Sequence, residues 1–196
     1  DKLYEQPIIR DLISLLNLWS NTEKSEHAFL RILRNKLGVE KVASLTTEYF
    51  NNQSLLSLID FTLSLNNQTG EVARNIMESI RQIKTQDTTV LVYNILKSEK
   101  LYHESEWGKL TTKKKWHALN VFRKVLYGYC QNYSDKNPHE FIDFINIQKE
   151  VGDEVLPPLD EFADLPAVRI MTVHSAKGME FKHVLIPFLR SGTFPH

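Results

Sequence analysis

The segment 172–181, TVHSAKGMEF, gathers side chains that could recognise a phosphorylated ligand. Lys177 supplies a point charge suited to phosphate, and Gly178 permits a left-handed backbone or a close approach to a ligand. Apolar runs that contain β-branched residues flank the segment at 168–173 and 184–188. This pattern predicts a buried strand, a turn and a second strand, with polar groups presented where the first strand ends. An ordinary solvated turn is the alternative.

A second candidate is the basic segment 109–117, KLTTKKKWH. The chain's 24 Lys and Arg balance its 24 Asp and Glu, so any nucleic-acid contact must use a local patch of this kind. Trp107 and Trp116 flank the cluster, and lysines beside aromatic rings can follow a phosphate backbone. The alternative is a solvated helix end next to one buried tryptophan. The lysines concerned are Lys109, Lys113, Lys114 and Lys115.

Helical periodicity runs through the chain up to about residue 151. Pro7 suits the first turn of a helix, and Ile9, Leu12 and Leu16 lie on one apolar face of it. Thr22 or Ser25, Thr69 and Asp87 are expected to cap the second, fifth and sixth helices. The later helices are expected around Phe29–Leu33, Val42–Phe50, Leu55–Leu65, Thr69–Ile83, Asp87–Leu96, Thr112–Asn132 and as far as Glu150.

Composition excludes several classes of protein. With 42% hydrophobic residues the chain can bury a substantial core, and no apolar run approaches the roughly 18 residues of a membrane span. The first residues lack the features of a signal peptide. One cysteine, Cys130, excludes an internal disulfide and a cysteine-based zinc site, and the histidines show no metal-ligand spacing. These features indicate a cytoplasmic protein without a bound metal.

Both ends of the chain resemble one known family. Residues 168–187 are similar to motif V of the UvrD/PcrA/Rep family of superfamily 1 DNA helicases, which reads apolar strand, Thr-x-His-x-x-Lys-Gly-Leu-Glu-Phe, apolar strand. Met179 replaces the usual leucine at little change in volume. Residues 3–19 resemble the motif IV region of the family, with IRDL at 9–12 in place of its Ile-Lys-Asp-Leu core. The matching positions of motif V are Thr172, His174, Lys177, Gly178, Glu180 and Phe181.

The resemblance implies roles for the turn. Thr172, His174 and Lys177 would contact phosphates or sugars of single-stranded DNA. Gly178 and Glu180 would belong to the ATP site, where the glutamate reaches the ribose hydroxyl. The plain alternatives are a histidine that caps a strand end and a glutamate that faces solvent.

The resemblance also gives Gly38 a possible role. In the family, a glycine-containing turn at this place contacts the backbone of duplex DNA, and Lys36 and Lys41 could assist such a contact. Glu40 stands where a second glycine would help, so a plain interhelix turn is an equal alternative.

The family's large helical insertion, the 2B subdomain, lies between motifs IV and V. We therefore expect a mainly α protein, a multi-helix orthogonal bundle followed by a small α/β strand-turn-strand remnant of a RecA-like domain. The expected parts are a motif IV border at 1–20, the helical insertion at 21–151, an acidic, proline-containing linker at 152–166 and the motif V segment at 167–196.

The parent protein would be an ATP-dependent 3′-to-5′ DNA helicase that uses ATP and Mg²⁺. The partners of this chain would be DNA and the rest of the helicase chain, with no membrane. No phosphate loop or magnesium-ligand pair is present in the sequence, so these 196 residues should contain no catalytic residue and should not hydrolyse ATP. The alternatives are a recombination helicase-nuclease of the RecB/AddA kind and a stand-alone helical interaction module with an accidental C-terminal match.

Overall fold

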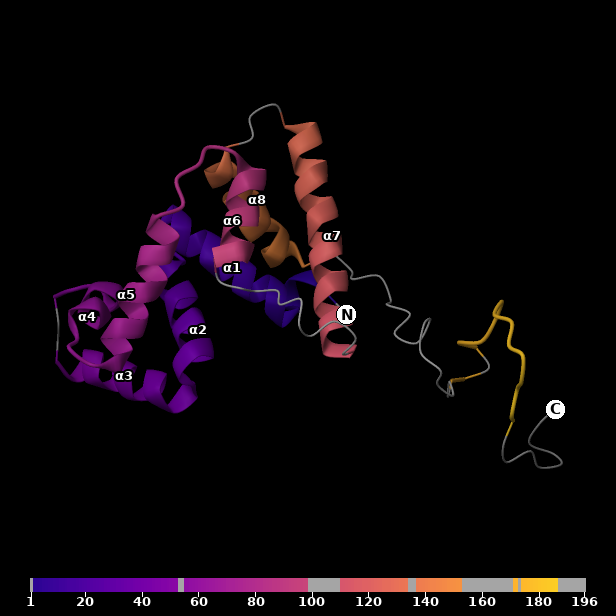
Figure 1. Cartoon of the computed structure of the whole chain (residues 1–196), viewed down its shortest axis with the longest axis horizontal. Coiled ribbons are helices and arrows are strands. Elements are labelled where there is room, and N and C mark those ends of the chain that lie inside the picture. Colours follow the sequence, from indigo (N-terminus) through magenta and orange to yellow (C-terminus); the bar gives the residue numbers. More distant parts are fainter. Residues whose placement is uncertain are drawn as a thin grey trace. The chain divides into compact units, whose positions relative to one another are not determined.

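The computed structural model describes residues 2–52, 55–98, 110–133, 137–152, 171–172 and 174–186, with the backbone alone at 110–112. Over these residues the chain is mainly helical, as predicted. It divides into two compact units, Asp1–Glu161 and Phe162–His196. All helices in the described ranges belong to the first unit (Figure 1).

Each helix expected from the periodicity is present, within a few residues of its predicted ends. A short 3-10 helix, η1, precedes eight α-helices in the described residues. None of these helices is both long and apolar enough to cross a membrane. The bounds are η1 Leu3–Glu5, α1 Pro7–Ser20, α2 Ser25–Leu37, α3 Val39–Asn51, α4 Leu58–Ser64, α5 Gln68–Arg81, α6 Thr88–Ser98, α7 Leu110–Asn132 and α8 Pro138–Val151.

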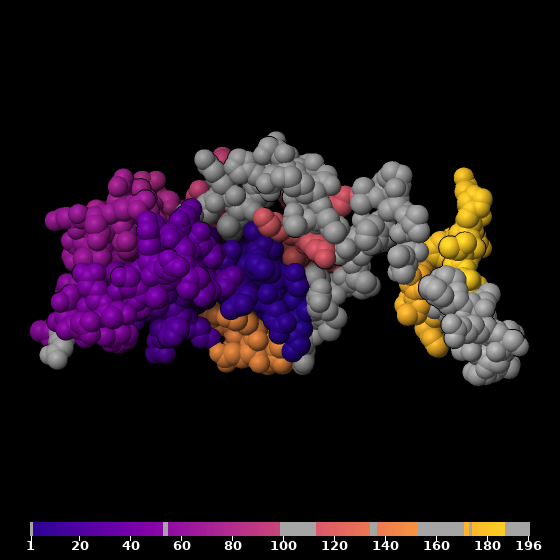
Figure 2. Space-filling model, turned by 90° about the horizontal axis from the view of Figure 1, so that it is seen from below, coloured from indigo at the N-terminus to yellow at the C-terminus, as the bar shows by residue number. Residues whose placement is uncertain are grey.

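α1 is the central helix of the first unit. Pro7 occupies its first position, where the missing N–H has no helical partner to lose. Ile9, Leu12 and Leu16 are at most 1% exposed, and the helix contacts α2, α5, α6, α7 and α8. The first residues of the chain (indigo) and α8 (orange) lie side by side on one face of this unit (Figure 2). The burial of α1 therefore depends on most of the bundle rather than on one neighbour.

Two asparagines join α1 to α8 inside the apolar core. Asn146 Nδ2 donates to Asn17 Oδ1 at 2.8 Å, and Asn17 Nδ2 donates to the Ile13 carbonyl at 2.9 Å and to Asn146 Oδ1 at 3.3 Å. Thr22 Oγ1 donates to Asn17 Oδ1 at 2.9 Å, and Ser25 Oγ donates to the Asn17 carbonyl at 3.0 Å. The prediction that Thr22 or Ser25 caps α2 is wrong, because both hydroxyls bind Asn17 and α2 begins without a side-chain cap.

The other two predicted caps have different outcomes. Asp87 Oδ1 accepts hydrogen bonds of 2.8 and 3.0 Å from two backbone N–H groups at the start of α6, so this cap is confirmed. Thr69 does not cap α5. Asn67 does, because its Oδ1 accepts the Gly70 N–H at 3.0 Å and the helix already begins at Gln68.

The second unit contains the segment predicted to form a strand, a turn and a second strand. Residues 174–178 form the turn, but none of the described residues 171–172 and 174–186 lies in a strand. The predicted strand-turn-strand is therefore not seen in them. Val184, Leu185 and Ile186 are 69%, 91% and 53% exposed. A strand needs neighbours that satisfy its backbone, and the described residues supply none. The remaining predicted strand residues and nearly all of the predicted linker lie outside the described ranges.

Candidate nucleic-acid interface

Thr172 organises the turn of the second unit. Its Oγ1 accepts the Ser175 N–H at 3.1 Å and lies 2.8 Å from Ser175 Oγ, and its carbonyl accepts the Ala176 N–H at 3.1 Å. A hydroxyl that accepts a backbone N–H three residues later is the arrangement by which a side chain caps the start of a helical turn. Thr172 therefore shapes this turn as well as presenting a polar group on it.

Gly178 closes the same turn in the left-handed region, with φ +81°, which is one of the two roles that the sequence left open for this glycine. A Cβ built on Gly178 would meet no atom within 4 Å, so the backbone conformation and not a lack of space is the reason for glycine here. The Lys177 N–H donates to the His174 carbonyl at 3.3 Å, and the Met179 N–H donates to the Ala176 carbonyl at 3.0 Å. Two hydrogen bonds thus fold the segment around the glycine.

The turn presents several functional groups to solvent. Thr172, His174, Lys177 and Glu180 are all exposed, and none of them is in an ion pair with another described residue. A hydroxyl, an imidazole and an ammonium can each donate a hydrogen bond to a phosphate oxygen, and a carboxylate can accept one from a sugar hydroxyl. The arrangement suits a ligand that combines phosphate and sugar.

Gly38 forms the whole connection between α2 and α3. Its backbone has φ 90° and ψ 165°, and its N–H donates to the Arg34 carbonyl at 2.8 Å. α3 then starts at Val39 without a side-chain cap. The first N–H groups of such a helix have no helical acceptors, so they and the helix dipole favour an anion at this end.

The charges around this junction are mixed. Lys36 and Lys41 are exposed on either side of it, and Glu40 lies in the first turn of α3. Lys41 Nζ donates to Gln68 Oε1 at 2.7 Å, which holds this ammonium beside the start of α5. A phosphate at the start of α3 would therefore be attracted by two lysines and repelled by one glutamate.

The lysines of the other predicted patch lie near the start of α7. Lys113 is half-buried, and Lys114 and Lys115 are exposed, while Lys109 lies outside the described residues. Consecutive helical residues point about 100° apart, so these side chains spread around the helix instead of forming one flat patch. Positive charge is also unfavourable near a helix N-terminus.

The predicted residues thus form three groups on different elements. They are the turn with Thr172, His174, Lys177, Gly178 and Glu180, the α2–α3 junction with Lys36, Gly38 and Lys41, and the start of α7 with Lys113, Lys114 and Lys115. Ser175, whose hydroxyl adjoins Thr172, was part of the turn in the sequence but was not predicted to have a role. The available signal was Thr172 itself, because a threonine hydroxyl often bonds to the backbone a few residues later.

A mainly helical unit and an exposed Thr-x-His-x-x-Lys-Gly-Met-Glu-Phe turn are consistent with the resemblance of the sequence to superfamily 1 helicases. The UvrD-like helicase C-terminal domain family matches the chain over residues 1–196, and the chain belongs to this family. The alternative of a stand-alone module with an accidental C-terminal match is therefore wrong.

Relatives of the chain carry the name ATP-dependent DNA helicase PcrA. The protein of Bacillus subtilis (strain 168) is 26% identical over 210 residues, and that of Staphylococcus aureus (strain Mu50) is 25% identical over 210 residues. These matches cover 100% of this chain but only 28% and 27% of the two relatives. The chain thus spans little more than a quarter of the relatives' length. No solved structure matches it.

Proposed function

We propose that this chain is part of an ATP-dependent DNA helicase that moves 3′ to 5′ along a single strand in the cytoplasm. The observation that carries the proposal is the exposed turn at 172–181, which places a hydroxyl, an imidazole, an ammonium and a carboxylate around the left-handed Gly178. The PcrA name of the relatives supports it.

In this proposal the turn serves two ligands. Thr172, His174 and Lys177 donate hydrogen bonds to phosphates or sugars of single-stranded DNA. Glu180 accepts a hydrogen bond from the ribose hydroxyl of ATP, and Gly178 lets the backbone approach the nucleotide. The fit is good for a sugar, since the exposed Glu180 carboxylate has no ion pair within the described residues.

ATP phosphates and Mg²⁺ would bind to other parts of the helicase chain. The sequence holds no phosphate loop, and no three His, Cys, Asp or Glu side chains of the described residues are grouped as metal ligands. This chain contributes the groups that bind the ribose of ATP and the single-stranded DNA. The bound nucleotide supplies the energy of movement through hydrolysis of its terminal phosphate.

We further propose that the helical unit is the 2B insertion and that it contacts duplex DNA. The uncapped start of α3 can direct backbone N–H groups at a phosphate, with Lys36 and Lys41 beside it. Lys113, Lys114 and Lys115 form the competing contact. Such binding would not depend on base sequence, because neither group needs to reach a base edge.

Substitutions in the full-length helicase test the turn. We expect Glu180→Ala to weaken nucleotide use with little change in DNA binding, and His174→Ala to weaken single-strand binding and its coupling to ATP hydrolysis. Loss of one hydrogen bond to a ligand costs about 1–3 kcal/mol, or roughly 5- to 150-fold. His183→Ala is the matched control, since His183 is exposed in the same segment but lies outside the motif. If both substitutions left ATPase activity and single-strand affinity within about twofold of the control, the assignment would be wrong.

A salt series on this chain tests the duplex contact. Log affinity for duplex DNA falls with log salt at a slope of about −0.9 per neutralised phosphate. Replacing Lys36 and Lys41 with glutamine should flatten the slope by about 1.8 if the α2–α3 junction binds the duplex, and the same change at the α7 lysines should then have little effect. An unchanged slope in both sets would exclude direct duplex contact by these residues.

A further inference from the structure

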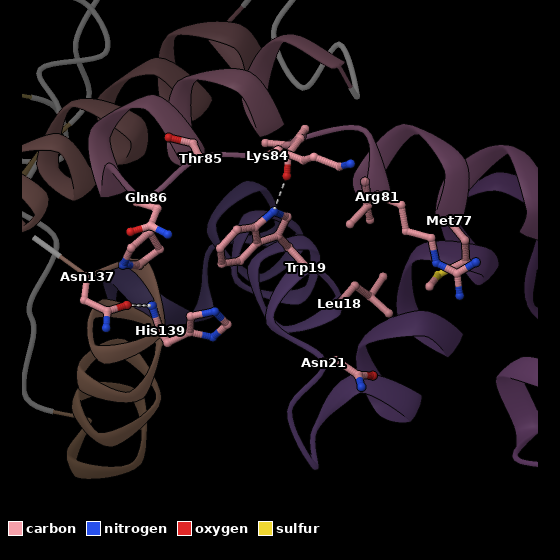
Figure 3. A pocket seen from close by; sticks show the side chains of 13 residues that line it. Leu18, Trp19, Asn21, Met77, Arg81, Lys84, Thr85, Gln86, Asn137 and His139 are labelled. Carbon is pink, nitrogen blue, oxygen red and sulfur yellow. Dashed lines mark hydrogen bonds between the residues drawn. The ribbon is translucent and has the colours of Figure 1, made fainter.

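The first unit contains a large groove that none of the predicted sites uses. Its volume is about 1090 Å³, and it lies between the end of α1, the end of α5 with the following connection, and the start of α8. Figure 3 shows Trp19 at its centre, His139 on one side and Arg81 on the other. Small-molecule sites commonly have volumes of about 300–1,000 Å³, so the groove is large enough for a ligand of that size.

Two aromatic rings form one wall of this groove. The Trp19 and His139 ring centroids are 5.0 Å apart, with the planes inclined at 34°. Trp19 Nε1 donates to the Ile83 carbonyl at 2.7 Å. This hydrogen bond fixes the indole in place and uses its N–H within the fold. His139 is exposed. The wall therefore offers flat aromatic surface to a ligand.

The charge of the groove, over the residues that the structure describes, is positive. Arg81 and Lys84 line it, and none of its other described lining residues is charged in the opposite sense. Both are exposed, and neither has an ion pair among the described residues. The N-terminus of α8 adds a positive helix end, where Asn137 Oδ1 accepts the His139 N–H at 3.0 Å. A ligand with an aromatic part and negative charge fits these groups.

A second cavity continues the positive side of the groove. Its volume is about 480 Å³, and it shares Met77, Arg81 and Lys84 with the first. Its lining adds Arg74 and one acid, Glu78. Arg74 Nη1 is bonded to two carbonyls at the end of α4 and lines only the second cavity, whereas Arg81 and Lys84 line both cavities and can contact a ligand that passes from one into the other.

We propose that this groove binds a short stretch of single-stranded DNA, with a base stacked on the Trp19–His139 wall and phosphates held by Arg81 and Lys84. The inference rests on the proposed function of the parent as a DNA helicase. A single strand can unstack and place a base against a protein ring, whereas the bases of a duplex are stacked on each other. Stacking on a ring and contacts to phosphate suit any base, so we expect binding that depends little on sequence.

The proposal is tested by the binding of a fluorescein-labelled oligo(dT) of about twelve nucleotides to the whole chain. Fluorescence anisotropy measures this binding over a salt series. Arg81→Gln with Lys84→Gln should weaken binding and flatten the salt dependence by about 1.4, since each single-strand phosphate contact contributes about 0.7. His139→Ala should weaken binding at least about fivefold without changing the slope, because it removes stacking and not a fixed charge. The matched control is Arg123→Gln with Lys124→Gln, an exposed pair on α7 that does not line the groove.

Several results would overturn the proposal. The first is an equal loss of affinity and slope in the α7 control, which would mean that only net charge matters. The second is unchanged oligo(dT) binding in both groove variants. The third is tighter binding of an acidic, aromatic peptide than of oligo(dT), which would assign the groove to a protein partner instead. Circular dichroism melts verify that each variant is folded. Duplex binding is measured in parallel. If it persists while the groove variants change nothing, only this inference fails; if the chain binds no DNA, the duplex contact proposed for the helical unit fails with it.

Discussion

Replacement of Gly38 by alanine measures how much one backbone conformation contributes to the free energy of unfolding. With φ 90° and ψ 165°, Gly38 occupies a region that is nearly restricted to glycine, and other residues held in such a region cost about 1–3 kcal/mol each. A Cβ on Gly38 would meet no atom within 4 Å, so no clash adds to this cost. We therefore expect Gly38→Ala to lower the free energy of unfolding by about 1–3 kcal/mol. For a unit of this size the Tm should fall by about 2–12 °C.

Gly128→Ala is the matched control, because a Cβ on Gly128 also meets open space but this glycine lies inside α7. Alanine is favoured over glycine in a helix by about 0.5–1 kcal/mol, so this variant should be more stable than the original chain. Urea titration and thermal melts followed by circular dichroism at 222 nm measure both. If the two variants shifted stability in the same direction by similar amounts, the conformational argument for Gly38 would be refuted.

Three further predictions use the same unfolding measurements. Gly70→Ala places a Cβ 2.0 Å from the Leu65 carbonyl oxygen, so the α4–α5 corner must move, at a cost of about 1–3 kcal/mol or more; a variant as stable as the original would contradict this packing. Asn146→Ala should cost about 1–3 kcal/mol, because it leaves the buried Asn17 amide short of a partner, and a loss below about 0.5 kcal/mol would refute the proposed importance of this pair. Partial burial, and then repulsion from nearby cations, lowers the pKa of Lys149, so the folded state binds its proton less readily than the unfolded state does. Lys149→Met should therefore stabilise the chain modestly at neutral pH, and this advantage should vanish as the pH rises to the ordinary lysine pKa near 10.5; a destabilised variant at pH 7 would show that burial and repulsion do not disfavour the charged lysine significantly.

The local features of this protein could be predicted from neighbours in the sequence. The helix that begins at Pro7, the cap at Asp87 and the left-handed glycine at Gly178 each depend on residues within one turn. The motif V resemblance is equally local, and the family match over the whole chain confirms the family. The predicted strands failed in the described residues because a strand, unlike a helix, needs hydrogen-bond partners from outside its own segment.

Tertiary packing decided the features that join distant segments. Asn17 lies at a core position of α1, where an apolar side chain is expected. Only the approach of Asn146, 129 residues later, explains an amide at this position. The packing that forms the groove likewise brings Trp19 next to His139 and places Arg81 and Lys84 in the same lining. By itself the sequence determined where helices form and which turn carries the motif V side chains. It did not determine which helix ends meet, because that depends on how whole apolar faces pack together, and no short-range spacing records that packing.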